Sequence, residues 1–171
     1  MTDNYPSKLR FNFGFLIEAL LGTSRKVELD FPTIEVSDDL TLTPFKGTFT
    51  ATRTSEGVYL SGKLRSITAV TCVRCLEKTT VPTTLQINDL FFYPPDSAPE
   101  GEYAINGDGD LDLAPLVREL SLLEIPIQPI CRPDCQGLCG QCGKNLNNDN
   151  CNCEADNIDP RFAALKNLLD S

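Results

Sequence analysis

Eight cysteines carry most of the chemistry that this sequence of 171 residues offers. Two pairs have the CxxC spacing, Cys72-Val73-Arg74-Cys75 and Cys139-Gly140-Gln141-Cys142. At this spacing a tight turn brings two thiolates onto one metal ion. Gly143 follows the second pair and lets its turn curl, so that backbone N–H groups point at the sulfurs. The spacing predicts a zinc knuckle.

The other cysteines decide how many ions the chain holds. Cys151 and Cys153 are predicted to complete the knuckle site, because the turn-rich stretch 145–150 brings them back toward it. The four remaining cysteines, Cys72, Cys75, Cys131 and Cys135, are enough for a second four-thiolate site. In a competing arrangement the two CxxC pairs hold a single zinc ion. The sequence therefore predicts one or two zinc ions.

Three other uses of the cysteines are alternatives to zinc binding: a redox pair, an iron–sulfur cluster and disulfides. A thioredoxin-type redox pair needs a CxxC at a helix N-terminus, whereas Cys72 and Cys75 lie between two predicted strands. Neither ferredoxin spacing occurs, which disfavours an iron–sulfur cluster. A disulfide framework needs export, but the apolar stretch 11–21 is interrupted by polar residues and no Ala-x-Ala cleavage site follows it. We expect a cytoplasmic protein, with a thiol–disulfide redox response as the alternative function.

Composition narrows the function further. The chain has no histidine, which excludes Ser-His-Asp and Cys-His nucleophilic sites and His-ligated metals. A four-thiolate zinc site is coordinatively closed, with no position for water or substrate. The predicted protein is therefore a binding protein and not an enzyme, with no small-molecule substrate and no membrane partner.

Charge is distributed unevenly along the chain, whose net charge is −9. Residues 1–80 hold ten basic and nine acidic side chains, whereas residues 81–171 hold five basic and fifteen acidic. Nucleic acid is therefore expected to contact only the local basic stretch 53–78. The predicted contact residues are Arg53, Lys63, Arg65, Arg74 and Lys78.

The elements that position these residues follow from periodicity. Strands are predicted over 27–36, 42–54, 58–67 and 79–93, as an antiparallel meander with Pro82 at an edge or bulge. Helices are predicted over 11–21, over 113–122 after a long loop, and over 160–169. The fold class is α+β: a sheet or partial barrel of about four to six strands with a Cys-rich zinc knuckle. Residues 1–93 form the sheet region, and 94–171 the helical and zinc-binding region packed with it as one domain.

Several segments together resemble the YceD family of large ribosomal RNA subunit accumulation proteins. They are Thr71–Glu77, Asp110–Leu113, Glu119–Pro126, Cys135–Cys139 and Asp159–Leu165. The resemblance implies a role in accumulation of large-subunit (23S) rRNA and in ribosome assembly, with metal binding and nucleic-acid contact. The partners implied are that rRNA or ribosome assembly proteins, and no catalytic reaction is implied. A further alternative is an acidic adaptor that binds a ribosomal protein without touching RNA.

Overall fold

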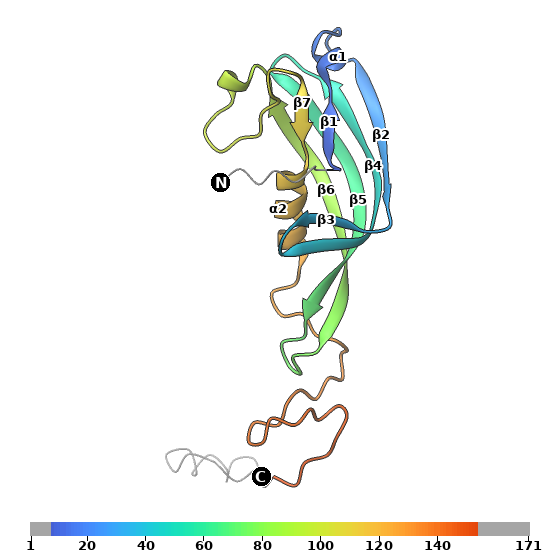
Figure 1. Ribbon diagram of the computed structural model, residues 1–171, viewed down its shortest axis with the longest axis vertical. Coiled ribbons are helices and arrows are strands. Elements are labelled where there is room, and N and C mark those ends of the chain that lie inside the picture. The colour runs from blue at the N-terminus through green and yellow to red at the C-terminus, as the bar shows by residue number, and fades with distance from the viewer. Residues whose placement is uncertain (1–7, 154–171) are drawn as a thin grey trace, which may run out of the picture.

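The computed structural model describes residues 8–153 and has the predicted α+β architecture (Figure 1). Its main sheet is antiparallel, with strand order β2-β4-β5-β6 and a short β3 that also pairs with β4. The sheet is open and does not close into a barrel, since β2 and β6 end it on either side. Pro82 lies on β6, an edge strand, where its missing N–H costs no ladder hydrogen bond.

The elements have the following bounds. The main sheet consists of β2 (Ser24–Phe31), β3 (Ile34–Ser37), β4 (Leu40–Arg53), β5 (Gly57–Thr71) and β6 (Lys78–Phe92). A separate two-stranded ribbon pairs β1 (Arg10–Asn12) with β7 (Asp110–Asp112). The helices are α1 (Gly14–Ile17), the 3-10 turn η1 (Pro95–Ser97) and α2 (Ala114–Glu124). Neither α1 nor α2 could cross a lipid bilayer, being too short. The helix predicted over 160–169 lies outside the described residues.

Two sequence predictions need correction. The predicted strand 27–36 is two strands, because the chain turns at Pro32 and Thr33 and β3 folds back onto the first residues of β4. The predicted helix 11–21 is a single turn, α1. The residues before α1 extend instead, because β7 offers them a partner about a hundred residues away, pairing Phe11 with Leu111.

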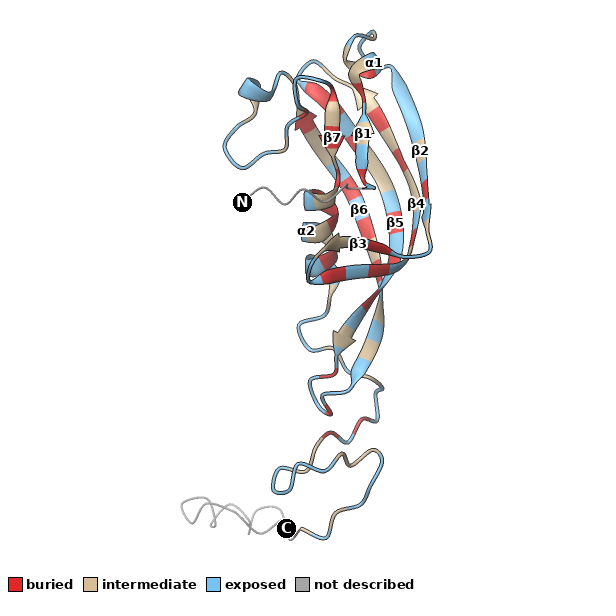
Figure 2. Ribbon diagram, viewed as in Figure 1, coloured by how far each residue is buried: buried red, intermediate tan, exposed pale blue. Residues whose placement is uncertain are grey.

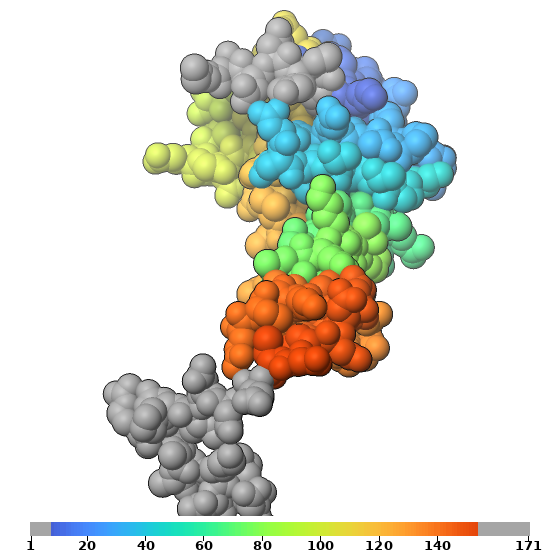
Figure 3. Space-filling model, turned by 60° about the horizontal axis from the view of Figure 1, so that its bottom comes forward, coloured from blue at the N-terminus to red at the C-terminus, as the bar shows by residue number. Residues whose placement is uncertain are grey.

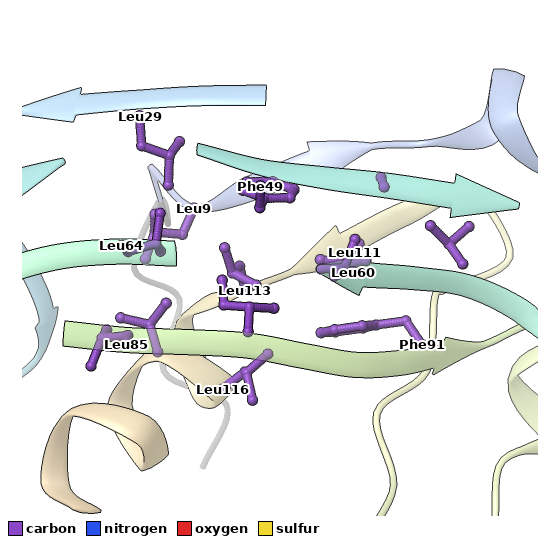
Figure 4. Packing of buried hydrophobic residues seen from close by; sticks show 14 of the residues in the cluster. Leu9, Leu29, Phe49, Leu60, Leu64, Leu85, Phe91, Leu111, Leu113 and Leu116 are labelled. Carbon is purple, nitrogen blue, oxygen red and sulfur yellow. The ribbon is translucent and has the colours of Figure 1, made fainter. Parts of the chain in front are cut away.

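One face of the sheet holds the core. Strict alternation in the middle of β5 turns Leu60 and Leu64 inward, both fully buried, while Lys63 and Arg65 face solvent (Figure 2). α2 packs on β6 and β3 over this face, and the β1–β7 ribbon adds Leu111 to the same core (Figures 1 and 4). The opposite face of β4, β5 and β6 carries no helix from the described part of the chain.

The β5–β6 hairpin extends beyond the rest of the sheet. β4 last pairs with β5 at Leu42 and Thr68, whereas β5 and β6 stay paired to Thr71 and Lys78. Beyond the pair Thr68 and Val81, the two strands and the turn between them form an arm. The arm carries the first CxxC at its tip, against the segment that follows α2 (Figures 1 and 3). The arm therefore fixes where the cysteines meet.

Candidate metal centres

The structure gathers the eight thiols into two groups of four, as in the two-site arrangement. In each group the sulfur atoms all lie within 4.8 Å of one another. The first thiol group is Cys72, Cys75, Cys131 and Cys135. The second thiol group is Cys139, Cys142, Cys151 and Cys153.

Distances in the first thiol group suit one tetrahedral ion. The Sγ atoms of Cys72 and Cys135 are 3.9 Å apart, and those of Cys75 and Cys131 are 3.7 Å apart. A Zn–S bond of ~2.3 Å in a regular tetrahedron separates the sulfurs by roughly 3.8 Å. A disulfide would bring two sulfurs to about 2.05 Å, and all eight cysteines are free. The donor set therefore fits a single thiophilic ion.

The two CxxC turns share one backbone geometry. Leu76 N–H donates to the Cys72 carbonyl at 3.0 Å, and Gly143 N–H donates to the Cys139 carbonyl at 2.9 Å. In both turns the residue after the second cysteine is left-handed, with φ of 59° at Leu76 and 72° at Gly143. Glycine adopts the left-handed conformation freely, whereas in leucine the side chain destabilises it by roughly 1–2 kcal/mol. The first turn thus stores strain that the second avoids.

Replacing Leu76 by Gly is expected to relieve this strain. Glycine's larger backbone entropy in the unfolded chain offsets part of the gain, leaving roughly 0.5–1 kcal/mol in favour of the closed turn. Chelator competition on the first thiol group should show two- to fivefold tighter zinc binding. The matched control is Gly143→Leu, which makes the opposite change in the second turn and should weaken zinc binding there. Weaker binding by Leu76→Gly would contradict the shared geometry.

Asn147 supports the first thiol group from outside it. Its Nδ2 donates to Cys135 Sγ at 3.4 Å, while its Oδ1 accepts from the Gln136 N–H at 2.9 Å and from Arg132 at 3.1 Å. Such contacts orient thiolates and tune their basicity. The sequence signal is the asparagine-rich stretch 145–150, whose composition by itself predicts only a turn.

The same stretch fastens the first thiol group to the arm. Asn145 and Asn148 both donate to Glu77 Oε1, at 2.8 and 3.3 Å. The Arg74 guanidinium donates to the Cys135 carbonyl at 3.0 Å, and the Arg74 carbonyl accepts from the Leu138 N–H at 3.0 Å. Polar contacts from the C-terminal segment therefore surround the arm's tip.

Asn147→Ala is expected to weaken zinc binding at the first thiol group by 10- to 100-fold. That range is typical when a hydrogen-bond donor to a metal ligand is lost. Competition with a chromogenic chelator measures the affinity. Asn150→Ala, at an exposed position of the same stretch, is the control and should leave both sites unchanged. Equal affinity for the two variants would show that the Asn147 contacts do not support the ligands.

Proton affinities differ within the first thiol group. Backbone N–H donation, chiefly from Cys75, lowers the pKa of Cys72 to about 6. Burial opposes the Cys135 thiolate, but Asn147 and Cys131 donate to it and bring its pKa below the ordinary value. Burial, followed by its contact with Cys135, raises the pKa of Cys131 to about 12. Although the Glu77 N–H favours a thiolate at Cys75, burial and the contact with Cys72 raise the pKa of that thiol.

Zinc binding to the first thiol group should therefore release fewer than four protons at pH 7.5. Cys72, whose pKa is lowered to about 6, is already a thiolate at this pH, and the lowered pKa of Cys135 favours its thiolate, whereas the two thiols of raised pKa must lose protons to bind. Calorimetry of the Cys151→Ser/Cys153→Ser variant, in buffers of different ionisation enthalpy, counts the protons. Below about pH 6 the count should rise as Cys72 becomes protonated. Release of four protons at pH 7.5 would contradict the pKa differences.

The five residues predicted to contact RNA do not form one surface. Lys63 and Arg65 lie two positions apart on β5 and share its exposed face, and Lys78 lies on this face at the start of β6. Arg74 lies in the first CxxC turn, and its guanidinium donates to the carbonyl of Cys135. Arg53 ends β4 and donates to the Gly57 carbonyl at 2.9 Å, closing the β4–β5 turn.

Sequence reasoning missed Lys46, which pairs directly with Arg65 across β4 and β5. Lys46 lies outside the basic stretch 53–78, and only the strand register brings it beside Arg65. No local sequence signal identifies such a neighbour.

Comparison with known proteins gives a consistent picture. The family model of the large ribosomal RNA subunit accumulation protein YceD matches residues 60–169. An uncharacterized protein of Mycobacterium tuberculosis is 38% identical over 120 residues, which are 67% of this chain and 57% of that protein. Uncharacterized protein YlbN of Bacillus subtilis is 33% identical over 100 residues, 57% of this chain and 58% of that protein. The matched part thus spans a little over half the length of these relatives.

A plant relative carries a functional name. The large ribosomal RNA subunit accumulation protein YCED homolog 1, chloroplastic, of Arabidopsis thaliana is 39% identical over 59 residues. The match covers 34% of this chain and 18% of that protein. No solved structure matches the chain.

Proposed function

The chain belongs to the YceD family of large ribosomal RNA subunit accumulation proteins, and from this premise we propose that it is a zinc-stabilised, non-enzymatic factor in large-subunit rRNA accumulation. The family name supplies the process. The two four-thiolate groups supply the physical character of the protein, a small sheet domain that carries closed metal sites.

The observation that carries the zinc assignment is the compactness of each thiol group. All four sulfurs of a group lie within 4.8 Å of one another, which suits one ion. A cluster of several irons would spread its thiolates further apart. Zinc is the usual ion in four-thiolate structural sites. When bound, zinc would cross-link segments of the chain and would catalyse no reaction.

A non-enzymatic role follows from the same donor sets. Four thiolates fill the coordination of zinc and leave no position for water or substrate. The two groups together use every cysteine of the chain, and the chain has no histidine. Closed sites of this kind stabilise the fold and thereby a binding surface. The protein then acts by binding rRNA or ribosome assembly proteins. Its proposed location is the cytoplasm, where ribosomes are assembled.

Depletion of the protein in its own cells tests the process. We expect mature 23S rRNA to fall relative to small-subunit rRNA, with restoration by the wild-type gene but not by a Cys72→Ser/Cys75→Ser variant. Ser121→Ala, which removes a hydroxyl bonded only within α2, is the control and should restore accumulation. Unchanged rRNA on depletion would reject the proposal.

Elemental analysis of the purified protein tests the cofactor. Two zinc ions per chain are expected, with thiols that react only after a chelator is added. Fast-reacting thiols in the native protein as purified, before any chelator is added, would instead support the thiol–disulfide alternative.

A further inference from the structure

A groove crosses the open face of the sheet where the arm leaves it. It has a volume of about 640 Å³ and is lined by residues of β4, β5 and β6. Three cationic side chains stand along it, those of Lys46, Lys63 and Arg65. We call it the basic groove.

Register fixes the spacing of these cations. Lys46 lies directly opposite Arg65 on the neighbouring strand. Lys63 lies two positions before Arg65 on β5, opposite Thr48. Two residues of a strand span roughly 6.7 Å, so the cations form a short row with Thr48 beside it. Within residues 8–153, no acidic side chain lines the groove.

The charge of the groove contrasts with that of the protein. The chain as a whole has a net charge of −9, so three cations without a lining acid make a local exception. Lys46 does form an ion pair with Asp30 at 2.8 Å, but both side chains are more than half exposed. An exposed pair of this kind contributes little and can exchange for another anion. The groove therefore suits a polyanion.

Apolar groups form the remainder of the groove. Ile67 is 40% exposed, and Pro82 lies opposite it on β6, with Pro44 contributing from β4. The described lining residues include no aromatic ring, so they offer no platform on which bases stack. It offers cations for phosphates, a threonine hydroxyl as a donor, and apolar contact for sugars.

We propose that the basic groove binds the phosphate backbone of single-stranded RNA. The inference rests on the proposed function, which makes rRNA an available partner. An acidic peptide fits less well, because β5 is hydrogen-bonded on both sides by β4 and β6. At its centre the groove thus presents side chains of β5 and no free strand edge, and on the edge strand β6 the lining residue Pro82 has no N–H to offer to the backbone of a peptide. The polyanion backbone of RNA needs only cations and hydroxyl donors.

Binding by phosphate contact alone has a measurable signature. Affinity should depend weakly on base sequence and strongly on salt, with a slope of about 0.7 per phosphate neutralised in a single strand. Lys63→Gln/Arg65→Gln in the full-length, zinc-loaded protein is therefore expected to weaken binding of a short labelled RNA at least tenfold. The salt slope should fall by about 1.4.

Lys8→Gln/Lys144→Gln is the matched control, since it removes the same charge from exposed positions outside the groove. Its slope should equal that of the wild type. Circular dichroism and thermal melting show whether the variants are folded. Equal affinity and slope for both double variants would overturn the proposal, as would tighter binding of poly-glutamate than of RNA by the wild type.

The groove and the proposed function fail in different ways. If depletion lowers 23S rRNA and the groove variant restores it fully while binding RNA like the wild type, the groove assignment is wrong and the function stands. If depletion leaves rRNA unchanged, the proposed function is wrong, and the RNA titration alone decides the groove.

Discussion

Replacing Cys131 and Cys135 together by Ser is expected to reduce the zinc content from two ions per chain to one and to detach the C-terminal segment from the arm. Half of the ligands of the first thiol group disappear, and two thiolates do not retain a tetrahedral ion against a chelator. Binding at structural zinc sites is worth about 10–16 kcal/mol, which is comparable to the whole stability of a domain. Few other changes in this chain should cost as much.

Limited proteolysis and elemental analysis measure this loss. The backbone hydrogen bonds between Val73 and Pro129 and between Leu138 and Arg74 should break. Protease cleavage is therefore expected within 126–138 in the variant and not in the wild type. The matched control is Cys151→Ser/Cys153→Ser, which removes two ligands from the second thiol group and should leave 126–138 protected. Two zinc ions in the Cys131→Ser/Cys135→Ser variant would contradict the grouping.

Phe49→Ala is expected to lower the free energy of unfolding by about 3–5 kcal/mol, the usual cost of a large cavity in a core. Phe49 is 1% exposed, and its ring meets that of Phe11 edge-on at 5.5 Å. Its cross-strand partner on β5 is Gly62. Because Gly62 has no side chain, the Phe49 backbone and Cβ can occupy the space beside it. Truncating the ring removes contacts that nothing nearby can replace.

Urea denaturation measures this effect, with Phe15→Ala as the control. Phe15 is 47% exposed, so its loss should cost far less. The pair of variants also tests the proposal that regions 1–93 and 94–171 form one domain, since one domain should give a single transition for both. Separate transitions for the sheet and the zinc-binding region would contradict it.

Local patterns predicted much of this molecule. Alternation identified β5 because one of its faces is buried along most of its length. A helix does lie within the predicted range 113–122: Leu116 and Val117 of α2 and Leu113 just before it are buried, and the Asp112 carboxylate accepts from the Ala114 N–H at its start. The CxxC spacings pointed to two turns that share a geometry, although Leu76 gave no sign of its left-handed backbone.

Long-range pairing was the part that local patterns could not supply. β1 forms only because β7, about a hundred residues further along the chain, pairs with it, and a three-residue segment has no detectable period of its own. The roles of Lys46 and Asn147 depend on strand register and on the path of a turn-rich segment. Charge alone predicts Arg74 as an RNA contact, and only the folded arm shows that its guanidinium also donates to the Cys135 carbonyl beside the first thiol group.

The first thiol group also sets an order of events during synthesis. Its sulfur contacts join residues 63 and 56 positions apart, so the arm's cysteines leave the ribosome long before their partners. At about 5–20 residues per second, this interval lasts roughly 3–13 seconds. β4, β5 and β6 can pair during that time, while Cys72 and Cys75 remain unmetallated. Metal capture at this group is then among the last steps of maturation, and the nascent chain is most sensitive to oxidants just before it.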